Sequence, residues 1–316
     1  MSAAWVAGGV RARALARRRL GAGAARRLAA RASLRDAQQS LDATAYGRRV
    51  HPGQELAAAQ HEIADTLLWD LRVLAGWLPQ DGVRLLRVLA AWFELANVDE
   101  LLAAFSGRPT EPEFQLGALA TAWPRLRQAG SGSGLRAVLA ASDWRDPGGD
   151  TERVVRLGMR VRYAARAAAL GGPVRAWAAG ALALLVAGEV CVGPVPGDTA
   201  PSDTVLDEAG ILLGPAALHA VSLAELADAL PSSARWVLDG VSAPDRLWRA
   251  EAAWRARVER DGLRLLSGGG LDDQVVIGAA AVMACDAWRV RAALELAARG
   301  GTPLDTYDEL ADDALA

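Results

Sequence analysis

The sequence predicts an all-α protein. Ala, Leu, Arg and Glu, which favour helices, are abundant among the 316 residues, whereas only three Ile, three Tyr and three Phe are present to furnish strands. Apolar side chains recur at helical spacing along much of the chain. An Ala-rich apolar stretch that ends in an acid also occurs three times at nearly equal intervals. Together these observations indicate a helical body built from repeated parts.

The expected helices follow from apolar periodicity and from the breaks between them. Leu56, Ile63 and Leu67 keep helical spacing and predict a helix over 55–77, which Pro79 ends. The other expected helices are, in chain order, 10–31 (weakened by Gly21 and Gly23), 36–44, one long helix over 85–105, 116–126, 135–144, 151–170, an apolar helix around 176–188, 205–220, 222–230, 247–266 and the last repeated stretch.

Two local signals add detail to this pattern. Ser222 followed by Glu225 has the spacing of a capping box and marks the start of the helix over 222–230. Residues 193–203, GPVPGDTAPSD, combine Gly, Pro and polar residues and are the best candidate for a linker.

The repeated stretches read LLRVLAAWFE, ending at Glu94, ALALLVAGE, ending at Glu189, and GAAAVMACD, ending at Asp286. The second acid follows the first by 95 positions and the third follows the second by 97. In the first and third copies, Val also follows the acid by four residues and Leu by eight. We therefore expect three similar helical lobes in one continuous body, at 1–110, 111–200 and 201–316, the last with an acidic tail.

Composition narrows the class of protein. All 35 basic residues are Arg, a bias that together with abundant Ala and Gly indicates a GC-rich genome rather than a phosphate-binding site. The two cysteines, Cys191 and Cys285, lack the spacing of a disulfide framework or a zinc site, which fits a reducing cytoplasm. The longest uncharged run, 176–188, has thirteen residues and is too short to span a bilayer, and no secretory signal is expected.

Charge is distributed unevenly although the net charge is only −2. Nine Arg residues precede the first acid, Asp36, whereas five acids and no base follow Arg299. Three interpretations of the basic segment stay open: an anionic partner, a transit peptide, or a solvated helix face. A nucleic-acid partner is not expected, because the whole chain is slightly acidic and has no helix-turn-helix or zinc signature.

No catalytic, cofactor-binding or metal-binding residue is expected. His51, His61 and His219 have no spaced carboxylate pair, and the chain has no Lys for a Walker-type loop and no GxGxxG turn. One enzyme hypothesis stays open, because the adjacent acids Asp272 and Asp273 resemble half of a magnesium site for a prenyl diphosphate.

Several short motifs together resemble the C/d family of V-type ATPase connectors, the proteins that join the central stalk to the proteolipid ring. After an Arg-rich first helix, an L-x-x-T-x-Y element lies within LDATAYG at 41–47, WFELANVDELL follows at 92–102, and the chain closes with VMACDAWRVRAALELAARGG. The resemblance spans nearly the whole chain and depends on the order and spacing of these motifs.

The resemblance implies a non-catalytic connector of a rotary ATPase. It would be a funnel-like body of three helical lobes with pseudo-threefold symmetry, seated on the cytoplasmic face of the proteolipid ring. The tip of the central stalk would dock into it, and membrane contact would occur only through the ring. The function would be mechanical, since torque would pass between the stalk and the ring that carries ions. An all-α scaffold protein stays as the alternative, followed by the magnesium-dependent prenyl enzyme.

The polar side chains at the repeat ends are the candidates for partner contact. They are Glu94, Asn97, Glu189, Asp286 and Arg289. The alternative for each is that it caps or braces its own helix.

Overall fold

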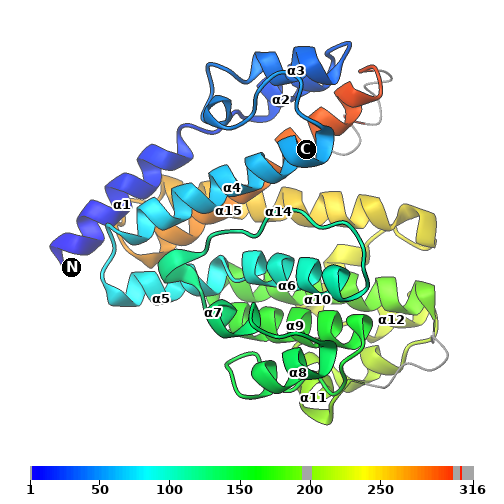
Figure 1. Cartoon of the computed structure of the whole chain (residues 1–316). Coiled ribbons are helices and arrows are strands. Elements are labelled where there is room, and N and C mark those ends of the chain that lie inside the picture. Colours follow the sequence, from blue (N-terminus) through cyan, green and yellow to red (C-terminus); the bar gives the residue numbers. More distant parts are fainter. Residues whose placement is uncertain (1, 194–200, 302–306, 308–316) are drawn as a thin grey trace. The chain divides into compact units, whose positions relative to one another are not determined.

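The computed structural model describes every residue except 1, 194–200, 302–306 and 308–316, and the described residues form helices and no strand. The all-α prediction is therefore confirmed for this part of the chain (Figure 1). The chain separates into two compact units. Unit 1 is Met1–Leu86 with Arg255–Ala316, and unit 2 is Arg87–Trp254. The division into three lobes stays a prediction.

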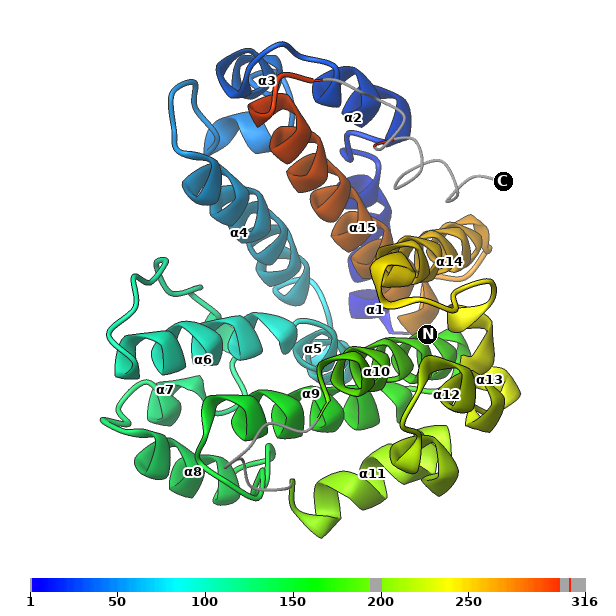
Figure 2. The same cartoon turned by 90° about the vertical axis from the view of Figure 1, so that its right-hand side faces the viewer.

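Unit 1 is organised around its C-terminal helix, α15 (Asp273–Ala298), which packs against α1, α2, α3 and α4 (Figure 2). Its helices are α1 (Ala3–Ala16), α2 (Ala22–Ala29), α3 (Leu34–Ser40), η1 (Tyr46–Arg48), α4 (Leu56–Ala75) and α15, with α5 (Gln80–Leu89) and α14 (Leu247–Ser267) crossing the unit boundaries. At Gly278 of α15 an added Cβ would lie 2.7 Å from the carbonyl oxygen of Gly262, so glycine permits α14 and α15 to approach closely.

Unit 2 contains a pair of packed helices, α9 and α10, against which several of its other elements lie. The helices of unit 2 are α6 (Trp92–Phe105), η2 (Gly117–Leu119), α7 (Trp123–Leu126), α8 (Gly132–Ala140), α9 (Glu152–Ala168), α10 (Gly172–Val192), α11 (Asp203–Leu213), η3 (Pro215–His219), α12 (Leu223–Ala229), α13 (Ser232–Arg235), η4 (Trp236–Leu238) and η5 (Pro244–Arg246).

Helix α10 is, among the described helices, the one that is long and apolar enough to cross a membrane by length and composition. It is also a packed helix of unit 2, with Trp177, Leu182 and Ala183 buried and contacts to α9, α11, α12 and α13. A buried helix in a protein core meets the same length and composition criteria.

Many predicted elements agree with the structure. The helices expected over 55–77 and 151–170 correspond to α4 and α9. The capping residue Ser222 accepts a hydrogen bond from the Glu225 N–H at 3.2 Å, while the Glu225 carboxylate accepts one from the N–H of Val221. Most of the linker expected at 193–203 lies outside the described residues.

The single helix expected over 10–31 is wrong, because α1 ends at Ala16 and α2 starts at Ala22. Gly21 has a φ of 80°, a left-handed value that a helix does not allow and that glycine adopts at little cost. The N–H groups of Leu20 and Gly21 donate to the side chain of Asp286 rather than to helix carbonyls. A long-range contact therefore determines where the helix breaks.

The single helix expected over 85–105 is also wrong, since α5 ends at Leu89 and α6 begins at Trp92. No Gly or Pro lies between them. The carbonyl oxygen of Leu89 accepts a hydrogen bond from the hydroxyl of Tyr163 at 3.3 Å, and the N–H of Phe93 donates to Ala90 instead. This rearrangement of hydrogen bonds interrupts the helix.

Candidate functional site

The carboxylate of Asp286, the acid of the third repeated stretch, joins three segments of unit 1. It lies on α15, and it accepts hydrogen bonds from the N–H groups of Leu20 at 2.9 Å and Gly21 at 2.7 Å. It also accepts one from the hydroxyl of Tyr46 at 2.8 Å. Because Asp286 is only 1% exposed, these three bonds are shielded from bulk solvent.

Glu94, the acid of the first repeated stretch, makes the same kind of arrangement in unit 2. From α6 it accepts hydrogen bonds from the N–H groups of Thr121 at 2.6 Å and Ala122 at 2.8 Å. Its third donor is the indole Nε1–H of Trp144, at 2.7 Å. Glu94 is likewise 1% exposed.

We call each arrangement a carboxylate clamp, defined by a buried acid, two consecutive backbone N–H groups and one aromatic donor. In both clamps the two N–H groups lie immediately before a short helix, α2 or α7, and the second belongs to its N-cap residue, where backbone donors lack helical partners. A carboxylate there satisfies these donors and interacts favourably with the helix dipole. Each clamp therefore fixes a long helix to the entry of a short one.

The aromatic donors are also presented by the same local structure. In unit 1 the Thr44 hydroxyl donates to the carbonyl of Leu41 at 2.7 Å and accepts from the N–H of Tyr46 at 3.2 Å. The same two bonds, at 2.8 and 3.1 Å, recur in unit 2, where the residues are Leu139, Ser142 and Trp144. The correspondence between the units thus extends from the acid to the turn that holds its donor.

Glu189, the acid of the second repeated stretch, is not part of such a clamp. It lies near the end of α10, is partly exposed, and pairs with Arg153 on α9. The second stretch therefore ends in an acid that forms an ion pair, whereas the acids of the first and third stretches form clamps.

Asn97 and Arg289, the other two candidates from the sequence, are also engaged inside their own units. The Asn97 amide donates to the carbonyl of Phe114 at 2.9 Å and accepts from the Phe114 N–H at 2.7 Å. Arg289 is 2% exposed and forms a two-pronged ion pair with Glu259, which is also buried. Both residues tie a long helix to a neighbouring segment.

The structure thus shows bracing bonds for Glu94, Asn97, Asp286 and Arg289, while Glu189 forms a surface ion pair. Glu94, Asn97 and Glu189 belong to unit 2, whereas Asp286 and Arg289 belong to unit 1. Contact between any of them and a partner stays a prediction.

Burial affects the chemistry of two groups near α15. It raises the pKa of Tyr46 well above its ordinary value, and the charge of Asp286 raises it further. Tyr46 therefore stays a protonated donor at neutral pH. Burial also raises the pKa of the Cys285 thiol to about 12, so this cysteine is not a reactive nucleophile.

One acid of the prenyl-enzyme hypothesis has a structural role. Asp272 is the N-cap of α15, and its carboxylate accepts a hydrogen bond from the N–H of Gln274 at 3.2 Å. Among the described residues, no group of three or more His, Cys, Asp or Glu side chains is arranged to hold a metal ion.

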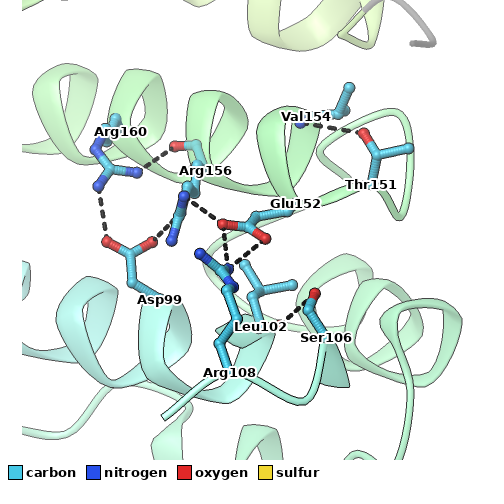
Figure 3. A network of polar contacts seen from close by, with 9 residues as sticks. All are labelled: Asp99, Leu102, Ser106, Arg108, Thr151, Glu152, Val154, Arg156 and Arg160. Carbon is cyan, nitrogen blue, oxygen red and sulfur yellow. Dashed lines mark hydrogen bonds and ion pairs between the residues drawn. The ribbon is translucent and has the colours of Figure 1, made fainter. Parts of the chain in front are cut away.

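A polar network that the sequence analysis did not predict lies in unit 2 (Figure 3). Asp99 on α6 pairs with Arg156 at 2.9 Å and Arg160 at 2.7 Å, both on α9. Glu152, at the start of α9, pairs with Arg108 at 2.6 Å and with Arg156. The arginines of α9 also line an open groove of about 560 Å³. Each acid of the network has a cationic partner. Because Asp99 lies on α6 and its two arginine partners lie on α9, the network joins these two helices.

The donors of the clamps were only partly visible in the sequence. Tyr46 belongs to the L-x-x-T-x-Y element, whereas Trp144 does not lie in an element of that sequence. The usable signal was Leu, then Ser or Thr three residues later, then an aromatic two residues after that, which occurs at 41–46 and again at 139–144.

Compared with protein-family models and with curated protein sequences, the chain matches none.

Proposed function

We propose that this protein is a non-catalytic connector of a rotary V-type ATPase, which couples rotation of the central stalk to the membrane proteolipid ring. The observation that carries the proposal is the carboxylate clamp, which occurs at Asp286 in unit 1 and at Glu94 in unit 2. These acids belong to stretches that the sequence repeat relates. A repeated body of this kind is what the resemblance to the C/d connector family implies.

The clamps also suit a mechanical role. A part that transmits torque has to resist deformation, and each clamp uses three charge-assisted hydrogen bonds to fix segments that are far apart in sequence. The buried pair of Arg289 and Glu259 adds a further connection, between α14 and α15. Side chains occupied in this way support stiffness rather than covalent chemistry.

In this proposal the protein has three lobes with pseudo-threefold symmetry and a funnel-like form. It lies on the cytoplasmic side, peripheral to the membrane, and contacts the membrane only through the proteolipid ring. The partners are the proteins of the central stalk and that ring. Ion transport is the activity of the whole complex, and the chain itself turns over no substrate.

A test is to remove the chain from its cells and assay inverted membrane vesicles. The proposal predicts that ATP hydrolysis continues while ATP-driven ion uptake is lost, because the motor and the ring are no longer coupled. Re-expression of the wild-type chain restores uptake. An Asp81→Asn variant restores it too, since this carboxylate is exposed and pairs with Arg84 one turn away. Unchanged ion uptake without the chain contradicts the proposal.

A scaffold or interaction protein outside any ATPase is the second candidate. Exposed tryptophans on and just beyond α4 favour a protein partner in either case, since Trp69 is 45% exposed and Trp77 is 52% exposed. Arg72 lies over the Trp69 ring, and Trp and Arg are the residue types most common at energetic centres of protein interfaces. The vesicle experiment separates the two candidates, because a general scaffold has no effect on coupling.

A further inference from the structure

A small cavity lies beside the Asp286 clamp, entirely within unit 1. Its volume is about 20 Å³, and its polar lining comes from Arg18, Arg19, Tyr46, Thr66, Asp70 and Asp286. The apolar part of the lining comes from Ala45 and from α1, α4 and α15. The cavity therefore lies where the first helix, the fourth helix and the clamp meet.

Asp70 is the lining residue whose hydrogen bonding is incomplete. It is 8% exposed, and its carboxylate lies 3.6 Å from the guanidinium of Arg18, which is too long for a hydrogen bond. Among the described residues it accepts no other hydrogen bond. A buried carboxylate has up to four acceptor positions and is costly to leave without partners. Burial accordingly raises the pKa of Asp70, against the attraction of Arg18, Arg11 and Arg48.

The size of the cavity restricts its ligand. A single water molecule needs about 10–15 Å³ of cavity volume and two to four polar partners. The cavity meets both conditions and has no room for an organic molecule.

The charges of the lining distinguish water from an ion. Two carboxylates, Asp70 and Asp286, would repel an anion, and two guanidiniums, Arg18 and Arg19, would repel a cation. The Asp286 carboxylate already accepts three hydrogen bonds. A neutral molecule that both donates and accepts hydrogen bonds fits such a lining best.

We propose that this cavity binds one ordered water molecule that donates to the Asp70 carboxylate and links it to the Tyr46–Asp286 clamp. The water supplies the hydrogen bond that Asp70 lacks and connects α4 to α15 through the clamp. It makes the clamp of unit 1 a four-segment network, whereas the direct bonds of the Glu94 clamp connect three segments.

The test is a crystal structure of the full chain at a resolution that shows ordered water. The proposal predicts one peak in the cavity, at hydrogen-bond distance from the Asp70 carboxylate. Crystals soaked in rubidium chloride or sodium bromide give no anomalous peak there. A rubidium or bromide peak at the site, or a cavity without density, overturns the proposal.

A pair of variants tests whether Asp70 is the anchor. Asp70→Asn keeps an oxygen acceptor in a side chain of the same shape, and the water peak is expected to remain. Asp70→Leu removes the acceptor and places apolar atoms toward the cavity, and the peak is expected to disappear. Persistence of the water in Asp70→Leu would overturn the role assigned to this carboxylate.

Discussion

The hydroxyl of Tyr46 provides the cleanest test of the clamps, because Tyr46→Phe removes one oxygen and leaves the ring in place. The lost bond is 2.8 Å long and ends on the buried carboxylate of Asp286. Hydrogen bonds to charged groups contribute about 1.5–3 kcal/mol each. The two backbone donors of the clamp, Leu20 and Gly21, remain bonded. We therefore expect a loss of about 1.5–3 kcal/mol in the free energy of unfolding.

Tyr163→Phe is the matched control. Its hydroxyl is removed from a partly buried ring, and it donates a longer bond, 3.3 Å, to the neutral carbonyl oxygen of Leu89. Such bonds contribute about 0.5–1.5 kcal/mol. Urea denaturation followed by circular dichroism at neutral pH measures both variants. A Tyr46→Phe variant as stable as the wild type, or no less stable than Tyr163→Phe, would refute the reasoning.

Three further predictions concern other buried or partly buried groups. Glu94→Gln puts an amide donor among the three donors of its clamp and is expected to lower the free energy of unfolding by about 2–4 kcal/mol. Glu189→Gln, at a surface ion pair, is expected to lower it by less than about 1 kcal/mol. Urea denaturation measures both variants. Since burial raises the pKa of Asp70, its contribution to stability is fully present below pH 3.8 and is lost as the pH rises through the raised value. Asp70→Asn should therefore gain stability relative to the wild type between about pH 3 and pH 7, and no change in the difference across that range would contradict this. Arg289→Leu leaves Glu259 charged and buried, so the free energy of unfolding is expected to fall by about 3–5 kcal/mol. Replacing Glu259 by Leu as well is expected to recover part of this loss. Equal losses in the single and double variants would be inconsistent with a buried pair.

The sequence was most informative where a helix depends on its own periodicity. Helices α4 and α9 appeared close to their expected bounds, because their apolar faces repeat regularly and Thr151 caps the second of them. The breaks after Ala16 and Leu89 could not be predicted in this way. Each depends on a side chain that is distant in sequence, Asp286 in one case and Tyr163 in the other.

The candidate site was predictable from the sequence only in part. The repeat predicted three equivalent acids, and two of them, Glu94 and Asp286, make equivalent contacts, whereas Glu189 does not. Periodicity does not say which backbone groups such acids meet. The N–H groups that bind Glu94 belong to Thr121 and Ala122, in a segment without a distinctive sequence pattern. The donor role of Trp144 depends on a turn in which the Ser142 hydroxyl accepts a hydrogen bond from the Trp144 N–H. Long-range hydrogen bonds of this kind are defined by the folded structure alone.

The most direct test of the proposed function is affinity purification of the tagged chain from gently solubilised membranes, with mass spectrometry of the proteins that accompany it. A tagged Asp81→Asn chain is the positive control, and a Glu94→Gln chain checked for folding by circular dichroism tests whether the clamp supports assembly. We expect the wild-type chain to recover the nucleotide-binding, central-stalk and proteolipid components of a rotary ATPase. Recovery of the folded wild-type chain without these components would contradict the proposed function.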